Sequence, residues 1–152
     1  MKLVEGKSVT DVKHGIILQQ VNCQGVMGSG VAAAIRGKWP SVFHDYRVHC
    51  HAGMTPEDVL GTMNVTEVEP QLFVINLFGQ LNYGRENKRY TSYDALDSAL
   101  VKTQDWMKKH GWFSFDVHHP LVGSGLGGGH WPVVAAMIDH RLGSDTTLWL
   151  YP

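Results

Sequence analysis

The chain has 152 residues, and its 13 Lys and Arg residues nearly balance its 14 Asp and Glu residues, for a formal net charge of −1. This length predicts one domain spanning residues 1–152, because single domains commonly run to roughly 100–200 residues. The near-zero charge gives no support to direct nucleic-acid binding, which relies on a basic excess or patch, and a content of 43% hydrophobic and 18% charged residues excludes a disordered chain.

The sequence also indicates where the protein resides. Cys23 and Cys50 are too few for a disulfide framework. Residues 1–7 lack the apolar run of a signal peptide, and no stretch approaches the roughly 18 apolar residues that a membrane span requires. We therefore expect a cytoplasmic protein with reduced thiols and no membrane association.

The first half of the chain mixes strand and helix patterns. Residues 16–21 form a short apolar run before a glycine-rich loop, which is typical of a buried strand. Val31 and Ile35 lie four apart on one face of a predicted helix, and Pro40 ends or kinks it. In chain order we predict an apolar start at 3–4, a strand at 16–21, helices at 31–36 and 42–50, a connection at 54–56, and strands at 63–68 and 72–78.

The second half continues the alternation. A polar loop covers residues 80–89, and helical spacing follows through 92–109, with Thr91 or Ser92 as the N-cap. We then predict a strand that carries Phe113, Phe115 and Val117, a helix over 131–142 and a closing strand over 148–151. Alternating strands and helices without a repeat or linker predict an α/β domain.

Glycine is the compositional outlier, with 17 residues. Three lie within residues 25–30 and five within 123–129, and each cluster follows a predicted strand and precedes a predicted helix. Glycine permits positive φ and close approach of backbone to a ligand, and N–H groups at a helix N-terminus bind anions. If the two strands are neighbours, the loops can hold a diphosphate from both sides. The alternative is that each loop is only a tight turn.

Neither loop matches the better-known phosphate motifs. The chain has no G-x-x-x-x-G-K-[ST] sequence, which disfavours a nucleoside triphosphatase. Gly28-Ser29-Gly30 matches part of a dinucleotide fingerprint, but the third glycine and the acidic residue about 20 positions later are not properly placed.

Together, three segments resemble the macro domain family. Residues 21–32, VNCQGVMGSGVA, resemble its first ligand loop, and residues 120–131, PLVGSGLGGGHW, resemble its second. Between them, residues 76–93 resemble the corresponding segment of small stand-alone bacterial and phage members. The resemblance covers essentially the whole chain, with the motifs in the family's order.

This resemblance implies a three-layer α/β/α fold with a mixed six-stranded sheet, and ADP-ribose lying across the strand ends. Asn22 and the backbone of residues 28–31 are expected to hold the distal ribose and part of the diphosphate, and residues 123–128 the remaining phosphate oxygens. We expect no cofactor and no metal. The full set of expected ligand-binding residues is Ser8, Asn22, Gly28, Ser29, Gly30, Val31, Tyr83, Arg85, Gly123, Ser124, Gly125, Leu126, Gly127 and Gly128.

The chain departs from the family at the position that reads adenine. Many macro domains carry an Asp in a Gly-Asp-Ile/Leu motif after the first strand, whereas Gly6 is followed here by Lys7. Ser8 or Asp11 is the candidate substitute.

It also departs at positions that are catalytic in related branches. The terminal ADP-ribose glycohydrolases use a Lys and an Asp where this chain has Gln80 and Gly127. The yeast ADP-ribose-1″-phosphate phosphatases carry a His where this chain has Gln19. Neither mechanism is therefore inherited by identity.

Several other polar or aromatic residues are of types that can bind a metal or a ligand. His44, His49, Cys50 and His51 form the sequence's one metal-like cluster, and we interpret them as structural because their spacing does not suit one helix face. We interpret His118-His119 as a strand end, with one ring able to face the cleft, and Trp39, Trp106 and Trp131 as core. Tyr83, Arg85, Arg89 and Tyr90 form a loop that either covers a ribose or is simply solvated.

The leading hypothesis is an ADP-ribose-binding hydrolase that acts on a derivative such as ADP-ribose 1″-phosphate. Its proton would be handled by His130, at a predicted helix N-terminus beside the second loop, or by a water held by Asn22 or Gln80. One alternative is a non-catalytic reader or sink of ADP-ribose or related nucleotides. The other is a glycohydrolase that removes ADP-ribose from protein or nucleic acid. The sequence leaves the oligomeric state open.

Overall fold

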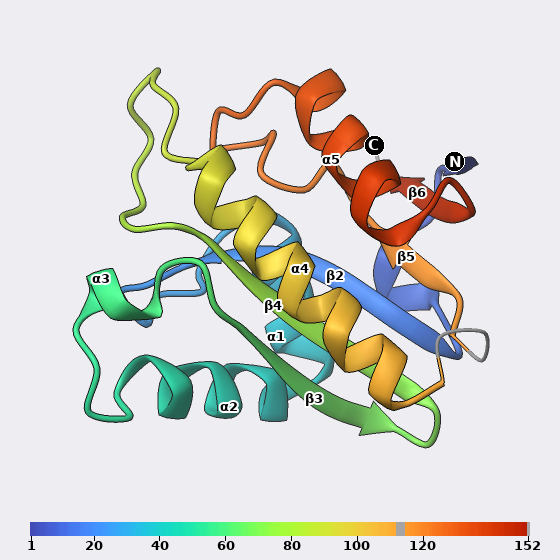
Figure 1. Ribbon diagram of the computed structural model, residues 1–152, viewed down its shortest axis with the longest axis horizontal. Helices are drawn as coiled ribbons and strands as arrows, with labels where there is room; N and C mark the ends of the chain where they lie inside the picture. The colour runs from blue at the N-terminus through green and yellow to red at the C-terminus, as the bar shows by residue number, and fades with distance from the viewer. Residues whose placement is uncertain (112–114, 152) are drawn as a thin grey trace.

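The computed structural model describes residues 1–111 and 115–151 (Figure 1). Its strands are β1 (Lys2–Glu5), β2 (Gly15–Asn22), β3 (Met63–Glu69), β4 (Leu72–Gln80), β5 (Val117–His119) and β6 (Thr146–Leu150). Its helices are α1 (Gly30–Lys38), α2 (Pro40–Cys50), α3 (Pro56–Val59), α4 (Tyr93–Lys109) and α5 (Trp131–Leu142), together with a 3-10 turn over Val9–Asp11.

The strands form one sheet in the order β1-β6-β5-β2-β4-β3. All neighbouring pairs are parallel except β3 and β4, which are antiparallel. The mixed six-stranded sheet implied by the family resemblance is therefore confirmed.

Helices cover both faces of the sheet, as Figure 1 shows. Ile35 of α1 and Val42 of α2 pack with Ile17 and Val74 on one face. Leu96 of α4 and Ile138 of α5 belong to the core on the other face. The three-layer α/β/α arrangement is thus confirmed, and it explains why Ile16, Ile17 and Leu18 are all fully buried, because the central strand is covered on both sides.

The helix boundaries follow local sequence signals. Pro40 separates α1 from α2 and occupies the first turn of α2, where its missing N–H costs no hydrogen bond. Ser92, rather than Thr91, caps α4, and its hydroxyl accepts from the backbone N–H of Ala95. Residues 54–56 were predicted as a connection, but Thr55 caps the short helix α3 through a capping box with Asp58.

The strand predicted over Phe113, Phe115 and Val117 was placed too early. Phe113 lies outside the described residues, and β5 begins only at Val117. Phe115 instead packs against Phe73, with ring centroids 5.5 Å apart, and against Trp106, at 5.6 Å. Phe115 therefore packs against aromatic rings outside β5 and is not part of the strand.

Candidate functional site

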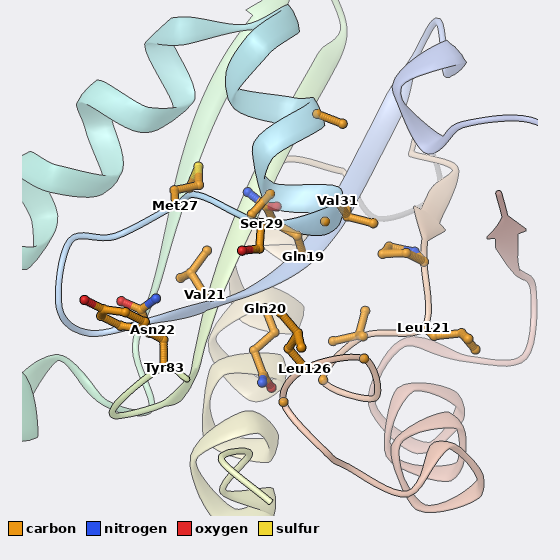
Figure 2. Close-up of a pocket in the computed structure, with 18 of the residues that line it drawn as sticks. Gln19, Gln20, Val21, Asn22, Met27, Ser29, Val31, Tyr83, Leu121 and Leu126 are labelled. Carbon is orange, nitrogen blue, oxygen red and sulfur yellow. The ribbon is translucent and has the colours of Figure 1, made fainter. Parts of the chain in front are cut away.

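A cavity of about 920 Å³ crosses the carboxyl ends of the parallel strands (Figure 2). The first glycine loop follows β2 and the second follows β5, and these strands are neighbours, which confirms the condition on which a two-sided site depends. Ligands of open α/β sheets commonly bind at this edge. The cavity therefore lies where the two loops face each other.

Most of the expected ligand-binding residues line this cavity. They are Ser8, Asn22, Gly28, Ser29, Gly30, Val31, Tyr83, Arg85, Gly123, Gly125, Leu126 and Gly127, joined by Gln80 from the proposed catalytic set. Ser124, Gly128 and His130 do not line it. The Ser124 hydroxyl donates instead to the carbonyl of Val122, at 3.3 Å.

His130 lies outside the cavity because the second loop turns away before α5 begins. It is exposed, and its backbone N–H donates to the Tyr93 hydroxyl at 2.9 Å. This bond, together with the guanidinium of Arg89 above the Tyr93 ring, lowers the pKa of Tyr93. His130 thus fastens the second loop to α4, and its predicted role in proton transfer has no geometric support.

The floor of the cavity is a network of carboxamides. Nε2 of Gln20 donates to Oε1 of Gln80 and to Oγ1 of Thr91, both at 2.8 Å. The Thr91 hydroxyl in turn donates to the carbonyl of Gly123 at 2.8 Å. The ends of β2 and β4 are thereby tied to the second loop.

Asn22 shapes the first loop. Its Oδ1 accepts from the backbone N–H of Gln24 at 2.9 Å, and its Nδ2 donates to the carbonyl of Val26 at 2.7 Å. The Tyr46 hydroxyl lies 2.7 Å from the same Oδ1. Because the oxygen has two protein partners, only the second N–H of the amide is left to meet a ligand or water.

Tyr46 of α2 was not identified from the sequence. It is fully buried, and its hydroxyl also accepts from the backbone N–H of Gly25 at 3.1 Å. Burial, reinforced by the neighbouring Cys50, raises the pKa of Tyr46. An aromatic residue on a helix face has the pattern of an ordinary core residue, so no sequence signal reveals that this hydroxyl organises the first loop.

The glycines of the second loop serve mainly to pack the loop. A Cβ on Gly127 would stand 2.7 Å from Oγ1 of Thr91, and one on Gly128, where φ is +71°, would stand 2.5 Å from the carbonyl oxygen of Lys88. A Cβ on Gly129 would stand 2.6 Å from the carbonyl oxygen of Gly123. By contrast, Gly125 has nothing within 4 Å. Gly127 and Gly128 are required where the loop lies against residues 88–91, Gly129 is required where the loop closes on Gly123, and Gly125 is the member that faces open space.

The two ends of the cavity differ in polarity. Gln80, Tyr83 and Arg85 line it beyond the end of β4, whereas Trp149, Leu150 and Tyr151 line it at β6, on the far side of β5. Figure 2 shows Asn22 and Tyr83 at one side of the cavity and Leu121 at the other. One elongated site therefore joins a polar end to an apolar end. The sequence had indicated Trp149 only as part of a strand.

The adenine-reading position carries no acid. Ser8 lines the cavity and its hydroxyl lies 2.7 Å from Oγ1 of Thr10, whereas Asp11 is exposed and does not line it. Within residues 1–111 and 115–151, no Asp, Glu, His, Lys or Cys is among the lining residues, and Arg85 is the one charged side chain there. The chemistry available at this site is therefore hydrogen bonding from amides, hydroxyls and one guanidinium.

The remaining histidine and tryptophan candidates lie away from the cavity. His49 is 2.8 Å from Oγ1 of Thr62 and stacks on Phe78, and burial lowers its pKa. His119 is fully buried between Pro120 and Thr146, and neither it nor His118 lines the cavity. Trp39 is buried, and Trp106 and Trp131 pack against the core that contains Leu96 of α4 and Ile138 of α5. None of the three lines the cavity.

The described residues contain neither a metal-binding cluster nor a membrane-spanning helix. No group of three or more His, Cys, Asp and Glu side chains in residues 1–111 and 115–151 is arranged to hold a metal ion. In the same part of the chain, no helix combines the length and apolar character needed to span a bilayer.

Comparison with known proteins agrees with this geometry. The family model described as Macro domain matches residues 19–138. The chain belongs to the macro domain family. The mixed six-stranded α/β fold is therefore that of a macro domain.

Among curated proteins, this macro domain is similar to the ADP-ribose 1″-phosphate phosphatase of Scheffersomyces stipitis. The two are 50% identical over an alignment of 99 residues, which covers 58% of this chain and 56% of the relative. The match thus spans little more than half the length of that protein.

Solved structures match over nearly the whole chain. A protein of unknown function from Bacteroides thetaiotaomicron has a TM-score of 0.82 at 25% identity, covering 99% of this chain and 96% of that one. A macrodomain protein from Streptomyces coelicolor has a TM-score of 0.78 at 25% identity, covering 99% of both chains. Thermosipho africanus DarTG in complex with ADP-ribose shares the fold, with a TM-score of 0.73 at 19% identity, over 99% of this chain and 42% of that one.

Proposed function

We propose that this macro domain binds ADP-ribose derivatives and hydrolyses ADP-ribose 1″-phosphate to ADP-ribose and phosphate. The observation that carries the proposal is the elongated cavity between the two glycine loops, apolar at one end and polar at the other. The similarity to a protein named ADP-ribose 1″-phosphate phosphatase supports the choice of substrate.

The polarity of the cavity gives the ligand a direction. In this proposal the adenine ring lies at the β6 end against Trp149, beside Ser8, and the distal ribose lies near Asn22 at the β4 end. The diphosphate lies between them, held by backbone N–H groups of residues 28–31 and 123–127. Amide donors suit this role because they stabilise phosphate charge without a net positive charge of their own.

Hydrolysis at this site would rest on electrostatic stabilisation. The attacking water would be held by the free N–H of Asn22 or by Gln80, its oxygen forming the new bond to phosphorus as the bond from phosphorus to the C1″ oxygen breaks. The water's proton would pass by way of a substrate phosphate oxygen to the departing C1″ oxygen, which leaves as the ribose hydroxyl, because among the described residues no lining side chain titrates near neutral pH. Fixed N–H donors aimed at the developing charge would supply the rate enhancement.

The same lining supports a second candidate, a non-catalytic reader of ADP-ribose. In the part of the chain that the structure describes, no carboxylate or imidazole lines the cavity, and Gln19, Gln80 and Gly127 stand where related hydrolases have reactive side chains. A reader requires only the binding groups. The glycohydrolase alternative is weaker, since Gln80 and Gly127 occupy the positions on which that chemistry depends.

The experiment measures phosphate release from ADP-ribose 1″-phosphate and the calorimetric Kd for ADP-ribose. Gly125→Glu is the blocking variant, since a side chain there meets no protein atom within 4 Å and enters the cavity with a negative charge. Gly37→Glu in α1 is the matched control, because it too has open space and does not line this cavity.

Three outcomes separate the candidates. Turnover by the wild type and Gly37→Glu, lost in Gly125→Glu, supports the phosphatase. Tight ADP-ribose binding without turnover above the Gly125→Glu level supports the reader. If the wild type binds neither ligand, both candidates are wrong.

A further inference from the structure

We propose that Arg85 is the residue that selects ligands with a terminal phosphate, so that ADP-ribose 1″-phosphate binds more tightly than ADP-ribose. The inference rests on the proposed function and adds to it a specificity-determining side chain. It starts from the charges that line the cavity, where Arg85 is the single charged side chain among the described residues.

Arg85 has no carboxylate partner among the described residues. The acid next to it, Glu86, pairs instead with Lys88, at 3.3 Å. The contact of Arg85 is a long hydrogen bond of 3.4 Å from Nη2 to the hydroxyl of Ser29. A guanidinium has five N–H donors in a planar fork, so most of its donors are free to meet an anion.

The position of Arg85 fits an anion at one end of an elongated ligand. The hydrogen bond to Ser29 joins the segment after β4 to the first glycine loop, across the polar end of the cavity. Tyr83 lines the same end, and the apolar residues Trp149 and Leu150 lie at the opposite end. A nucleotide with its base at β6 therefore brings the far end of its sugar, and any group attached there, to Arg85.

The chemistry of the guanidinium matches a phosphate monoester. A monoester carries close to two negative charges near neutral pH and offers three acceptor oxygens. The planar guanidinium donates to two of them at once, and such charge-assisted pairs are stronger than a bond to a neutral hydroxyl. The monoester therefore displaces the Ser29 hydroxyl as the partner of Arg85, whereas ADP-ribose, which ends in a hydroxyl, gains little from the exchange.

The basic neighbours of Arg85 provide a matched control. Lys88 lies three residues later in the same exposed segment, but it does not line the cavity and its ammonium contacts Glu86 and the ring of Tyr90. Lys88→Gln therefore removes one positive charge from the segment without removing a lining group. A change in ligand affinity that Lys88→Gln and Arg85→Gln share therefore comes from the lower positive charge of this segment.

The test compares two ligands with Arg85→Gln, Arg85→Lys and Lys88→Gln. Calorimetry gives the Kd for ADP-ribose, and the Kd or, where there is turnover, kcat/KM is measured for ADP-ribose 1″-phosphate. For ADP-ribose 1″-phosphate, the affinity or kcat/KM of Arg85→Gln should be about tenfold or more below that of the wild type, as expected for a lost charge-assisted pair. Its Kd for ADP-ribose should stay within about twofold of the wild-type value. Arg85→Lys should recover part of the loss, and Lys88→Gln should match the wild type.

If Arg85→Gln weakened the binding of both ligands equally, the inference would be overturned, since this would mean that Arg85 only shapes the loop or binds the diphosphate. An unchanged preference would overturn it as well. Both results leave the proposed function standing, because wild-type binding of ADP-ribose is measured in the same series. Failure of the wild type to bind either ligand would instead remove the proposed function.

Discussion

The hydroxyl of Tyr46 lies 2.7 Å from Oδ1 of Asn22, inside the protein behind the first glycine loop. It also lies 2.8 Å from the carbonyl oxygen of Asn22 and accepts from the backbone N–H of Gly25. One phenolic group from α2 therefore fixes the start of a loop whose other side faces the cavity. This makes the shape of the site depend on a residue that does not touch the ligand.

Tyr46→Phe should lower both stability and ligand affinity. Removing the hydroxyl leaves the part-buried N–H of Gly25 and the buried oxygens of Asn22 short of a partner, which costs about 1–3 kcal/mol in free energy of unfolding. Urea unfolding and the calorimetric Kd for ADP-ribose measure the two effects. Tyr90→Phe is the control, because within the described residues the Tyr90 hydroxyl makes no hydrogen bond. Equal stability of the two variants would contradict the role given to Tyr46.

Alanine substitution should change the stability of the protein at one glycine of the second loop and not at another three residues away. Gly128→Ala places a Cβ 2.5 Å from a backbone oxygen at a φ of +71°, so it should destabilise the protein by about 2 kcal/mol or more. Gly125→Ala meets nothing within 4 Å and should leave the unfolding midpoint unchanged. Thermal unfolding of both variants is the measurement. Similar midpoints would mean that the loop does not lie against residues 88–91.

The ion pair between α4 and α5 should stabilise the protein only above acidic pH. Arg141 donates to Asp97 through Nε at 2.9 Å and Nη2 at 2.8 Å, and these bonds lower the pKa of Asp97. Since the folded-state pKa lies below the unfolded value near 3.9, the contribution is full above about pH 4 and is lost as the pH falls through the folded pKa. Asp97→Asn should lower the melting temperature by about 2 °C at pH 7.

A pH series below the unfolded value near 3.9 supplies the control for Asp97→Asn. As the pH falls through the folded-state pKa, the carboxyl becomes protonated in the folded chain as well, so the difference in melting temperature between the wild type and the variant should shrink. A difference that persists unchanged at the lower pH would show that the substitution acts through packing.

His119 should remain neutral below its ordinary titration range. It is fully buried, and burial lowers its pKa. Its Nδ1–H donates to the carbonyl of Pro120 and its Nε2 accepts from the Thr146 hydroxyl, both at 3.0 Å, so the neutral ring satisfies both partners. Because the folded pKa is depressed, the stability it confers is full above about pH 6.5 and falls as the pH drops toward the folded value.

An imidazole NMR titration checks this assignment directly. The His119 signals should shift at a pH well below 6.5, the value of a free imidazole. In parallel, the free energy of unfolding should fall between pH 7 and pH 5 in the wild type and fall less in His119→Gln. A His119 titration at or above the free value would contradict the hydrogen-bonding pattern.

The sequence was sufficient to predict the two loops and the central strand of the site. Glycine clusters after strands and before helices indicated the two loops, and the apolar run at 16–18 indicated the central strand, because these are local patterns. Tertiary proximity could not be predicted in this way. His130 follows the second loop directly in sequence, yet the loop turns it away from the cavity, while Trp149, 20 residues after the loop, lines it. The sequence pattern also did not distinguish the glycines that the fold requires from those that face the cavity. The contacts of the second loop with residues 88–91 identify Gly127 and Gly128 as required by the fold.

The lining of the cavity has a consequence for proton exchange on binding. Among the described residues it includes a permanently charged guanidinium, amides, hydroxyls and apolar groups, and no side chain that changes charge between pH 5 and pH 8. A ligand without a titrating group should therefore bind without net proton uptake, and its heat of binding should be the same in buffers of different ionisation enthalpy. A phosphate monoester, with a second pKa near 6, brings its own proton equilibrium to the site. Any buffer dependence with that ligand then reports which ionic form of the phosphate Arg85 accepts.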